Sequence, residues 1–488
     1  MTLGQSIRSS SAWLFIGNTG SQVLAFLFGI VLARLLVPAD FGMLLTISIY
    51  TGIAGFVAGG GMGQALVRAK EVVNKDYDIV FTLQLIIGSL IYTTFFFSAP
   101  WFAKWYDTPL YTELLRISAL SFIFRPFVNL PGSILQREMR FKAKAGVGVA
   151  SLLISSVISI VMAYSGYGVW SLIWGGIVGA AVSASILIPL AKWRPRISFE
   201  FRRGRDIARY GLLVSLSDIV FYLRSQVSIF ILSRTLGPAS VGLFSKGESL
   251  ARMPHRFITG SLYPVLFRAL AAEENPDKSR YLFFRSISLI AVYATPFYVG
   301  LLWLAEPFIR AIYGIKWVEA AAPLTILALV WPAWLMGNLS GNVLAAKNWM
   351  NREFAVQVAS LAITFPAVVI GVPYGIDGVA WAIVATTVLT ASYQYWLAVR
   401  CLGAKLSGFF LAVIPAAVLN GLLAVTLFST DYLLPQPFHD NDFAYLACMA
   451  LVGCSAYVLS FLYLPLPTLK TEQHRWKTRL RLARKTAT

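Results

Sequence analysis

The chain alternates long apolar stretches with short polar segments. An apolar run of roughly 20 residues crosses a bilayer as an α-helix, and the runs here lack the two-residue alternation of a transmembrane β-barrel. The pattern therefore predicts an all-α polytopic membrane protein with about 14 transmembrane helices. The predicted spans lie near 11–35, 41–66, 79–103, 110–135, 145–165, 168–191, 208–234, 240–266, 282–305, 320–346, 354–374, 377–400, 407–429 and 443–465.

The composition supports a membrane protein and excludes other classes. Hydrophobic residues make up 57% of the 488 residues and charged residues 13%, against about 25% charged in soluble domains. A water-soluble globule and a disordered chain are both excluded. The three cysteines, Cys401, Cys448 and Cys454, offer no disulfide framework. We expect the first apolar run to be a membrane span and not a cleaved signal peptide.

The basic residues predict an orientation. Thirty of the 41 Lys and Arg residues fall in alternate segments that include both chain ends, and five fall in the opposite loops. The positive-inside rule then places both termini in the cytoplasm, which also explains most of the net charge of +19. The basic tail, 467–488, is predicted to contact anionic lipids at the cytoplasmic face of the membrane and not nucleic acid.

Three pairs of segments indicate an internal duplication. Residues 31–44 align with 231–244 and share the motif Arg-x-Leu-x-Pro-Ala, 117–135 align with 326–344, and 166–175 align with 375–384. Spans one to six thus recur as spans seven to twelve in the same sense, which predicts two parallel six-helix repeats around a central cavity. The predicted parts are lobes at 1–200 and 201–402, two further transmembrane helices at 403–466, and a basic tail at 467–488.

Charged residues inside the predicted spans are mostly cationic. The basic ones are Arg116, Arg125, Arg224, Lys246, Arg252 and Arg256, and the acidic ones are Asp218 and Glu248. Each ionised group at the centre of a membrane helix costs roughly 2.5–3.5 kcal/mol. The excess of cations predicts a hydrated cationic cavity; the alternative is internal pairing, for which Glu248 and Arg252 have the favourable four-residue spacing.

A buried cationic cavity selects anions, and guanidinium groups suit phosphate because their donors are forked and weakly hydrated. The candidate pyrophosphate ligands are Arg125, Arg224, Arg252 and Arg256. Asp218 and Glu248 serve either ion coupling or structural pairing. Candidate glycan contacts are Asn18, Gln22, Tyr222 and Asn338, with Gln64, Asn129, Gln226, Asn342, Trp331 and Trp334 as further polar or aromatic positions. The sequence predicts no catalytic residue, metal site or cofactor.

Three segments resemble a known family: GSILQREMRFKAKA (132–145), GGGMGQALVR (59–68) and the stretch 241–270. They are similar to Wzx-type exporters of the multidrug/oligosaccharidyl-lipid/polysaccharide flippase superfamily, in the branch of lipopolysaccharide and colanic-acid exporters. The resemblance implies a flippase in the bacterial inner membrane that moves polyprenyl-pyrophosphate-linked oligosaccharides to the outer leaflet for lipopolysaccharide or exopolysaccharide synthesis. A polysaccharide polymerase and export proteins are implied partners. The family has no strict motif that assigns a binding residue.

Three alternatives stay open. A drug/cation antiporter of the same superfamily would need buried acids in the first six spans, where the sequence places none, since Glu113 sits at a span edge. A membrane sugar polymerase or ligase would need a sizeable outer loop, and the largest, 430–442, is short. A channel or scramblase would transport without accumulation. Because no loop can house an ATPase or glycosyltransferase domain, we expect a carrier that is not an enzyme, whose last two spans form a groove for the lipid tail.

Overall fold

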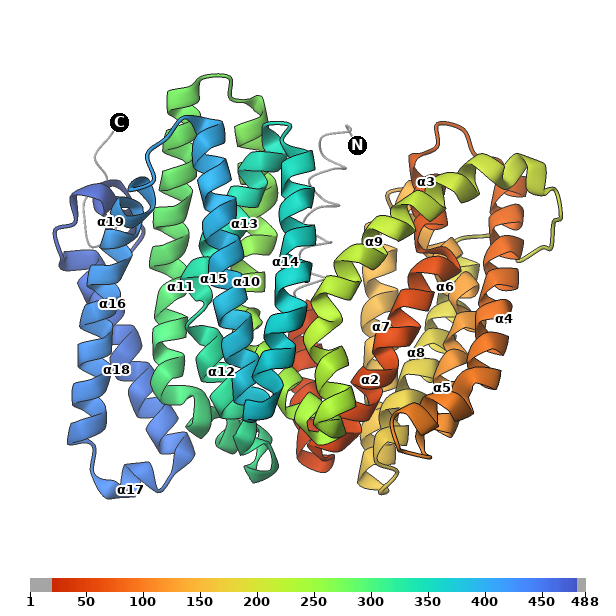
Figure 1. Cartoon of the computed structure of the whole chain (residues 1–488), viewed down its shortest axis with the longest axis horizontal. Coiled ribbons are helices and arrows are strands. Elements are labelled where there is room, and N and C mark those ends of the chain that lie inside the picture. The colour runs from red at the N-terminus through yellow and green to blue at the C-terminus, as the bar shows by residue number, and fades with distance from the viewer. Residues whose placement is uncertain (1–19, 481–488) are drawn as a thin grey trace. The chain divides into compact units, whose positions relative to one another are not determined.

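The computed structural model describes residues 20–480, apart from the side chains of residue 60 and of some positions within 201–221 and 256–264. The described residues form helices and turns and contain no β-strand, which confirms the predicted all-α class (Figure 1). The chain folds as two compact units, Met1–Gly242 and Leu243–Thr488.

Short turns join the helices of the first unit. Its π-helical turn and helices are Gly20–Leu35, α2 (Pro38–Gly55), η1 (Phe56–Gly60), α3 (Gly61–Arg68), α4 (Asn74–Trp105), α5 (Tyr111–Ala119), α6 (Ser121–Arg137), α7 (Phe141–Tyr164), α8 (Val169–Leu190) and α9 (Phe201–Thr235). α2 starts where it does because Pro38 occupies its first turn and the Asp40 carboxylate accepts from the Val37 amide at 3.1 Å.

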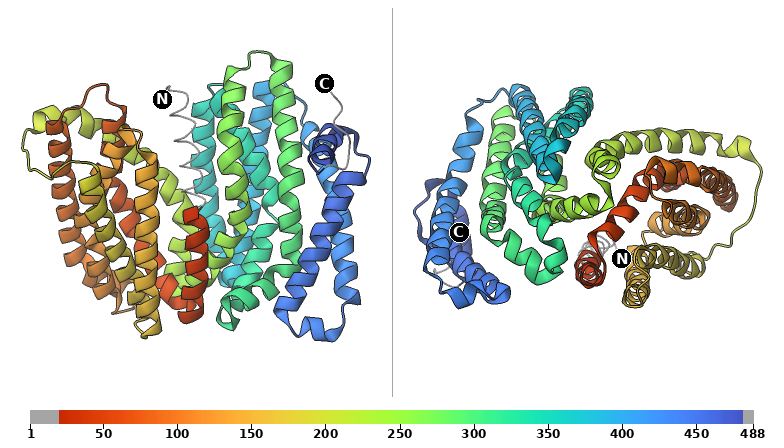
Figure 2. Two further views of the ribbon diagram at one scale, coloured as in Figure 1. Left: turned by 180° about the vertical axis from the view of Figure 1, so that it is seen from behind. Right: turned by 60° about the horizontal axis from the view of Figure 1, so that its bottom comes forward.

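The second unit is built around the long helix α11. α10 (Gly237–Ala272) begins in the first unit and continues into the second. The remaining helices and 3-10 turns are α11 (Pro276–Tyr313), η2 (Ile315–Ala320), α12 (Ala321–Ala328), α13 (Trp331–Ala346), α14 (Met350–Gly371), η3 (Val372–Tyr374), α15 (Gly375–Leu402), α16 (Gly408–Leu433), α17 (Gln436–His439), α18 (Asp442–Tyr463), η4 (Pro467–Leu469) and α19 (Lys470–Arg479). α16 and α18 lie beside α11 (Figure 2).

Small residues bring membrane helices together in the first unit. On α8, Gly175 and Gly179 face serines of α7, and a Cβ at Gly175 would collide with the Ser159 hydroxyl. Because of this close approach, the Ser151 hydroxyl of α7 donates to the Gly179 carbonyl at 2.6 Å. Glycine and serine are the residues expected at such an interface, since lipid gives helices no hydrophobic reason to associate.

Fewer helices meet a membrane-span criterion of length and hydropathy than the apolar runs predict. Among the described residues, eight helical segments are long and apolar enough to cross a membrane, or nine if the bent pair α12 and α13 forms one span. One of the eight, Met350–Leu402, contains both α14 and α15. Other predicted spans are short, like Gly20–Leu35, or carry several charges, like α9. The predicted total of 14 therefore stays a prediction.

The duplication is visible in irregular backbone at matching positions. The span at 111–137 breaks at Leu120, between α5 and α6, and its aligned counterpart breaks at Leu329 and Val330, with a bend of 53°. Gly166 precedes α8 with φ of 85°, and the aligned Gly375 begins α15 with φ of 74°. Both glycines adopt a left-handed conformation that other residues avoid.

The two copies of the Arg-x-Leu-x-Pro-Ala motif meet reciprocally within the first unit. A Cβ added at Gly42 would collide with the carbonyl of Pro238, and one at Gly242 would collide with the carbonyl of Pro38. Such a reciprocal contact is what a two-fold relation between repeats produces. α9 packs against α2 and α3 and so falls in the first unit, whereas the repeat places it in the second lobe. The lobe boundaries at 200, 402 and 466 stay predictions.

Candidate functional site

Arg125 rests in a notch of α2 in the first unit. A Cβ on Gly55 would collide with the Arg125 guanidinium, so the glycine creates the space that the cation fills. The guanidinium carbon lies 4.8 Å from the centre of the Phe122 ring. Among the described residues, no carboxylate forms an ion pair with Arg125. The aromatic ring is thus a described partner of the cation that carries no formal charge, and a membrane guanidinium in that state can accept an anion.

Tyr222 of α9 packs against Gly52 of α2, one helical turn before Gly55. Its hydroxyl donates to the Ser48 carbonyl at 2.6 Å, and its ring meets Phe56 edge-on at 5.5 Å. A Cβ on Gly52 would collide with the Tyr222 hydroxyl. Tyr222 thus holds α9 against α2 and uses the proton of its hydroxyl in doing so.

Further predicted residues of the first unit lie on α9 and on the first helix, while Gln64 and Asn129 lie on α3 and α6. Asp218 and Arg224 are both half-buried on α9, and Gln22 is exposed. Asn18 lies outside the described residues. The structure thus gathers Arg125 and Tyr222 on one face of α2. The assigned roles of all these residues stay predictions.

In the second unit, α10 carries an ion pair. An Arg252 amine lies 2.8 Å from a Glu248 carboxylate oxygen, four residues earlier, and the side chains are 41% and 17% exposed respectively. The guanidinium carbon also lies 5.3 Å from the centre of the Trp334 ring. The pairing that the spacing predicted is present, so Arg252 is not an unneutralised cation; its exposed portion still offers donors. The side chain of Arg256 lies outside the described residues.

Aromatic rings surround the position one turn beyond Arg252. The His255 ring centre lies 5.3 Å from that of Trp331 and 6.1 Å from that of Trp334. Its Nε2 lies 3.3 Å from the Asn338 amide nitrogen, and Tyr298 stacks on Trp331 at 4.5 Å. We call Arg252, His255, Trp331, Trp334 and Asn338 the aromatic cluster. Aromatic faces with amide and guanidinium donors can bind a sugar ring and its hydroxyls.

Sequence reasoning missed three features of the second unit. His255 follows Arg252 by three residues and hence shares its helix face, a signal that was available but not used. Tyr298 gave no local signal, because only the packing of α11 on α13 brings it to Trp331. Glu353 lies within α14, where its carboxylate accepts from Gln394 and Gln357 at 2.6 Å each. The expectation that Asp218 and Glu248 are the only acids of the spans therefore omitted a carboxylate at a span end.

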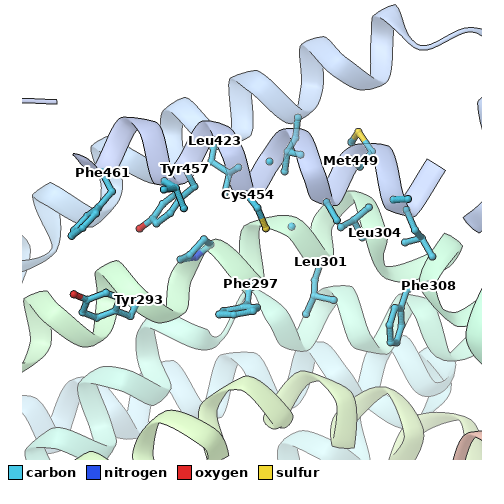
Figure 3. A pocket seen from close by; sticks show the side chains of 18 of the residues that line it. Tyr293, Phe297, Leu301, Leu304, Phe308, Leu423, Met449, Cys454, Tyr457 and Phe461 are labelled. Atoms are coloured by element: carbon cyan, nitrogen blue, oxygen red, sulfur yellow. The ribbon is translucent and has the colours of Figure 1, made fainter. Parts of the chain in front are cut away.

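An apolar groove runs between α11, α16 and α18 in the second unit, with a volume of about 1020 Å³. Figure 3 shows Tyr293, Phe297 and Leu301 on one wall and Cys454 and Tyr457 on the other. The residues of α11 recur at a spacing of three or four, so one apolar stripe of the helix faces the groove. The lining is chemically suited to hydrocarbon, and a lipid tail held by the last two spans stays a prediction.

Comparisons with known proteins agree with this architecture. The family described as "Polysaccharide biosynthesis protein" matches residues 31–322. The succinoglycan biosynthesis transport protein ExoT of Rhizobium meliloti is 27% identical over 67% of this chain and 66% of its own length. The lipopolysaccharide biosynthesis protein WzxC of Escherichia coli is 22% identical over 88% of this chain and 89% of its own.

Solved structures share the fold at low sequence identity. The lipid II flippase MurJ in an inward closed conformation superposes with a TM-score of 0.74 at 16% identity, covering 92% of this chain and 98% of that one. An inward-facing multidrug resistance MATE family transporter of the MOP superfamily gives a TM-score of 0.61 at 17% identity, covering 78% and 94%. With the family matched over more than half of the sequence, the resemblance seen in the sequence is confirmed: the chain belongs to the polysaccharide biosynthesis protein family.

Proposed function

We propose that the chain is a flippase that moves polyprenyl-pyrophosphate-linked oligosaccharides across the bacterial inner membrane by alternating access, with both termini in the cytoplasm. One observation carries the proposal: Arg125 holds a guanidinium among membrane helices without a carboxylate partner among the described residues. A charge kept in that state is costly unless water or an anion meets it. Family membership and relatives named as transport proteins for polysaccharides support the same class of cargo.

Each part of such a substrate has a chemically matched surface. Arg125 presents forked donors to phosphate oxygens, with Arg224, Arg252 and Arg256 as further candidates. The aromatic cluster offers ring faces and amide donors to sugars. The groove along α11 takes the hydrocarbon tail. A basic tail segment contacts anionic lipids, and a polysaccharide polymerase is the expected partner on the outer side. In this scheme the protein transports and makes or breaks no covalent bond.

The proposal is tested by reconstituting purified protein in vesicles and measuring the initial rate of flipping of a pyrophosphate-linked oligosaccharide. Replacing Arg125 by Gln removes one charge-assisted contact, which is worth about 1.5–3 kcal/mol, so we expect the rate at limiting substrate to fall about tenfold or more. Arg125→Lys keeps the charge and should retain an intermediate rate. An Arg252→Ala/Arg256→Ala double variant should also be slow.

Undiminished flipping in both the Arg125→Gln variant and the double variant would refute the phosphate role of these arginines. A wild-type protein that exchanges an organic cation for protons, and flips no lipid-linked glycan, would instead identify the drug/cation antiporter. The distribution of acids argues against that alternative: between residues 20 and 190, every carboxylate lies in a turn or within two turns of a helix end.

A further inference from the structure

A second, polar pocket lies within the first unit. It has a volume of about 330 Å³ and is bounded by η1, α3, α6, α7 and α8. The polar side chains that line it are Gln64, Asn129, Ser133, Gln136, Lys144 and Ser183. We call it the amide pocket. Three side-chain amides and two hydroxyls in one cavity among otherwise apolar helices form a set of donors and acceptors that hydrocarbon cannot satisfy.

Glycines keep the amide pocket open. Gly132 is buried, yet a Cβ built on it would have no neighbour within 4 Å, and a Cβ on the exposed Gly148 would have none either. Both residues line the cavity, so both face empty space and not a packed neighbour. Across the pocket, a Cβ on Gly63 would press against the Ser133 hydroxyl at 2.6 Å, which lets α3 approach α6 closely. The volume is thus created by backbone positions that lack side chains.

The amide pocket carries a positive charge. Among the described residues, Lys144 is the only charged one that lines it. Its ammonium donates to the Gln136 amide oxygen at 2.9 Å, and two of its three donors are left for other acceptors. Among the described residues, no carboxylate forms an ion pair with Lys144. The pocket is therefore suited to a polar ligand that carries one negative charge.

We infer that the amide pocket binds an acidic sugar residue of the transported oligosaccharide, with its carboxylate at Lys144 and its hydroxyls on the amides and serines. This inference rests on the proposed function and adds the class of glycan to it. A pyrophosphate fits the pocket less well, because it carries more charge than one lysine balances and favours the forked donors of arginine. A neutral sugar would leave the ammonium without a charged partner.

The test compares two lipid-linked oligosaccharides in the same vesicles. Both carry the pyrophosphate; one ends in a hexuronic acid and the other in the methyl ester of that acid. We expect the wild-type protein to flip the acid about tenfold faster at limiting substrate, as one charge-assisted contact implies. Lys144→Met should lower the rate for the acid to that for the ester and leave the ester unchanged, while Lys144→Arg should keep the preference.

Two further variants make the test specific to the cavity. Gly132→Val fills the pocket without meeting a protein atom within 4 Å of its Cβ, and it should also remove the preference for the acid. Lys142→Met is the matched control, because Lys142 lies on the same helix, is exposed and does not line the pocket. It should leave the preference intact.

Several outcomes would overturn the inference. Equal wild-type rates for acid and ester would exclude recognition of the carboxylate. If Lys144→Met lowers the flipping rate equally for both substrates, the lysine contacts a group that both share, either the pyrophosphate or a lipid headgroup. If the wild-type protein flips neither substrate, the proposed function fails. In that case the pocket is tested in the detergent-solubilised protein, by comparing the thermal stabilisation given by free hexuronate with that given by its methyl ester. If the two ligands do not differ in a way that depends on Lys144, the inference is rejected.

Discussion

Cations in the helices of this protein are held in two contrasting ways. Arg125 fits against a glycine and an aromatic ring, with no described carboxylate as an ion-pair partner, whereas Arg252 bonds to Glu248 at 2.8 Å. The sequence predicted both residues as membrane cations and the second as part of a helical pair. It could not distinguish their environments, because the notch for Arg125 is made by Gly55, seventy residues away. His255 was missed although its three-residue spacing from Arg252 was readable.

Glu248 is predicted to be a structural partner and not a carrier of coupling ions. Glu248→Gln removes the ion pair with Arg252, whose side chain is 41% exposed, so the loss of stability should stay below about 1 kcal/mol. We expect flipping to continue with the same response to an imposed pH gradient as in the wild-type protein. The measurement is the initial flipping rate in vesicles with and without the gradient. A response that is present in the wild type and absent in Glu248→Gln would contradict this role.

His255 is predicted to bind glycan through the aromatic cluster. His255→Phe keeps a ring beside Trp331 but removes the contact of Nε2 with Asn338. We expect KM for the lipid-linked oligosaccharide to rise about threefold to tenfold, as expected for one neutral hydrogen bond, with little change in the maximal rate. Vesicle flipping at several substrate concentrations separates the two quantities. A fall in the maximal rate at unchanged KM would point to a role in the conformational step instead.

At the scale of elements, the apolar runs predicted the all-helical class and the approximate positions of the helices. They did not predict where the helices are irregular or broken. The break at Leu120 carries no proline, glycine or charge that would mark it in the sequence, and the π-helical turn at Phe56–Gly60 is marked only by its glycines. Pro126 and Pro131, which do occur in the sequence, lie inside α6 without ending it. Packing on neighbouring helices decides these cases, because a membrane helix can satisfy a freed backbone group through its neighbours.

The glycine notch in α2 gives a prediction at this scale. Gly55→Ala places a Cβ against the Arg125 guanidinium, so it should displace the cation and slow flipping about as much as Arg125→Gln does. Gly176→Ala on α8 is the matched control, since its Cβ would have no neighbour within 4 Å. Flipping rates and thermal midpoints are measured for both. Wild-type flipping by a folded Gly55→Ala protein would show that the position of Arg125 is not critical.

For the whole molecule, the duplication is the feature that the sequence revealed most fully. Aligned segments share a broken span and a left-handed glycine at matching places, Leu120 with Leu329 and Gly166 with Gly375. The motif at 31–44 and its copy at 231–244 meet through Gly42 and Gly242. The number of spans could not be settled in the same way, because short, bent and charged helices fail a criterion of length and hydropathy.

The reciprocal contact predicts equal sensitivity of the two copies. Gly42→Val and Gly242→Val each force a side chain against the carbonyl of a proline in the other copy. Overpacking of this kind costs about 1–3 kcal/mol, and we expect both variants to lower the thermal midpoint in detergent by similar amounts. Gly29→Val, whose Cβ would have no neighbour within 4 Å, should leave the midpoint unchanged. A large effect at only one of the two glycines would argue against a symmetric contact.

The central claim is that guanidinium groups among the helices select a pyrophosphate. The most direct measurement compares flipping by the wild-type protein of one oligosaccharide linked to the same polyprenol through a pyrophosphate or through a monophosphate. Since the proposal assigns Arg125 to the phosphates and no described carboxylate pairs with it, we predict that the pyrophosphate form moves at least about tenfold faster at limiting concentration. Equal rates for the two linkages, or faster movement of the monophosphate, would contradict the claim.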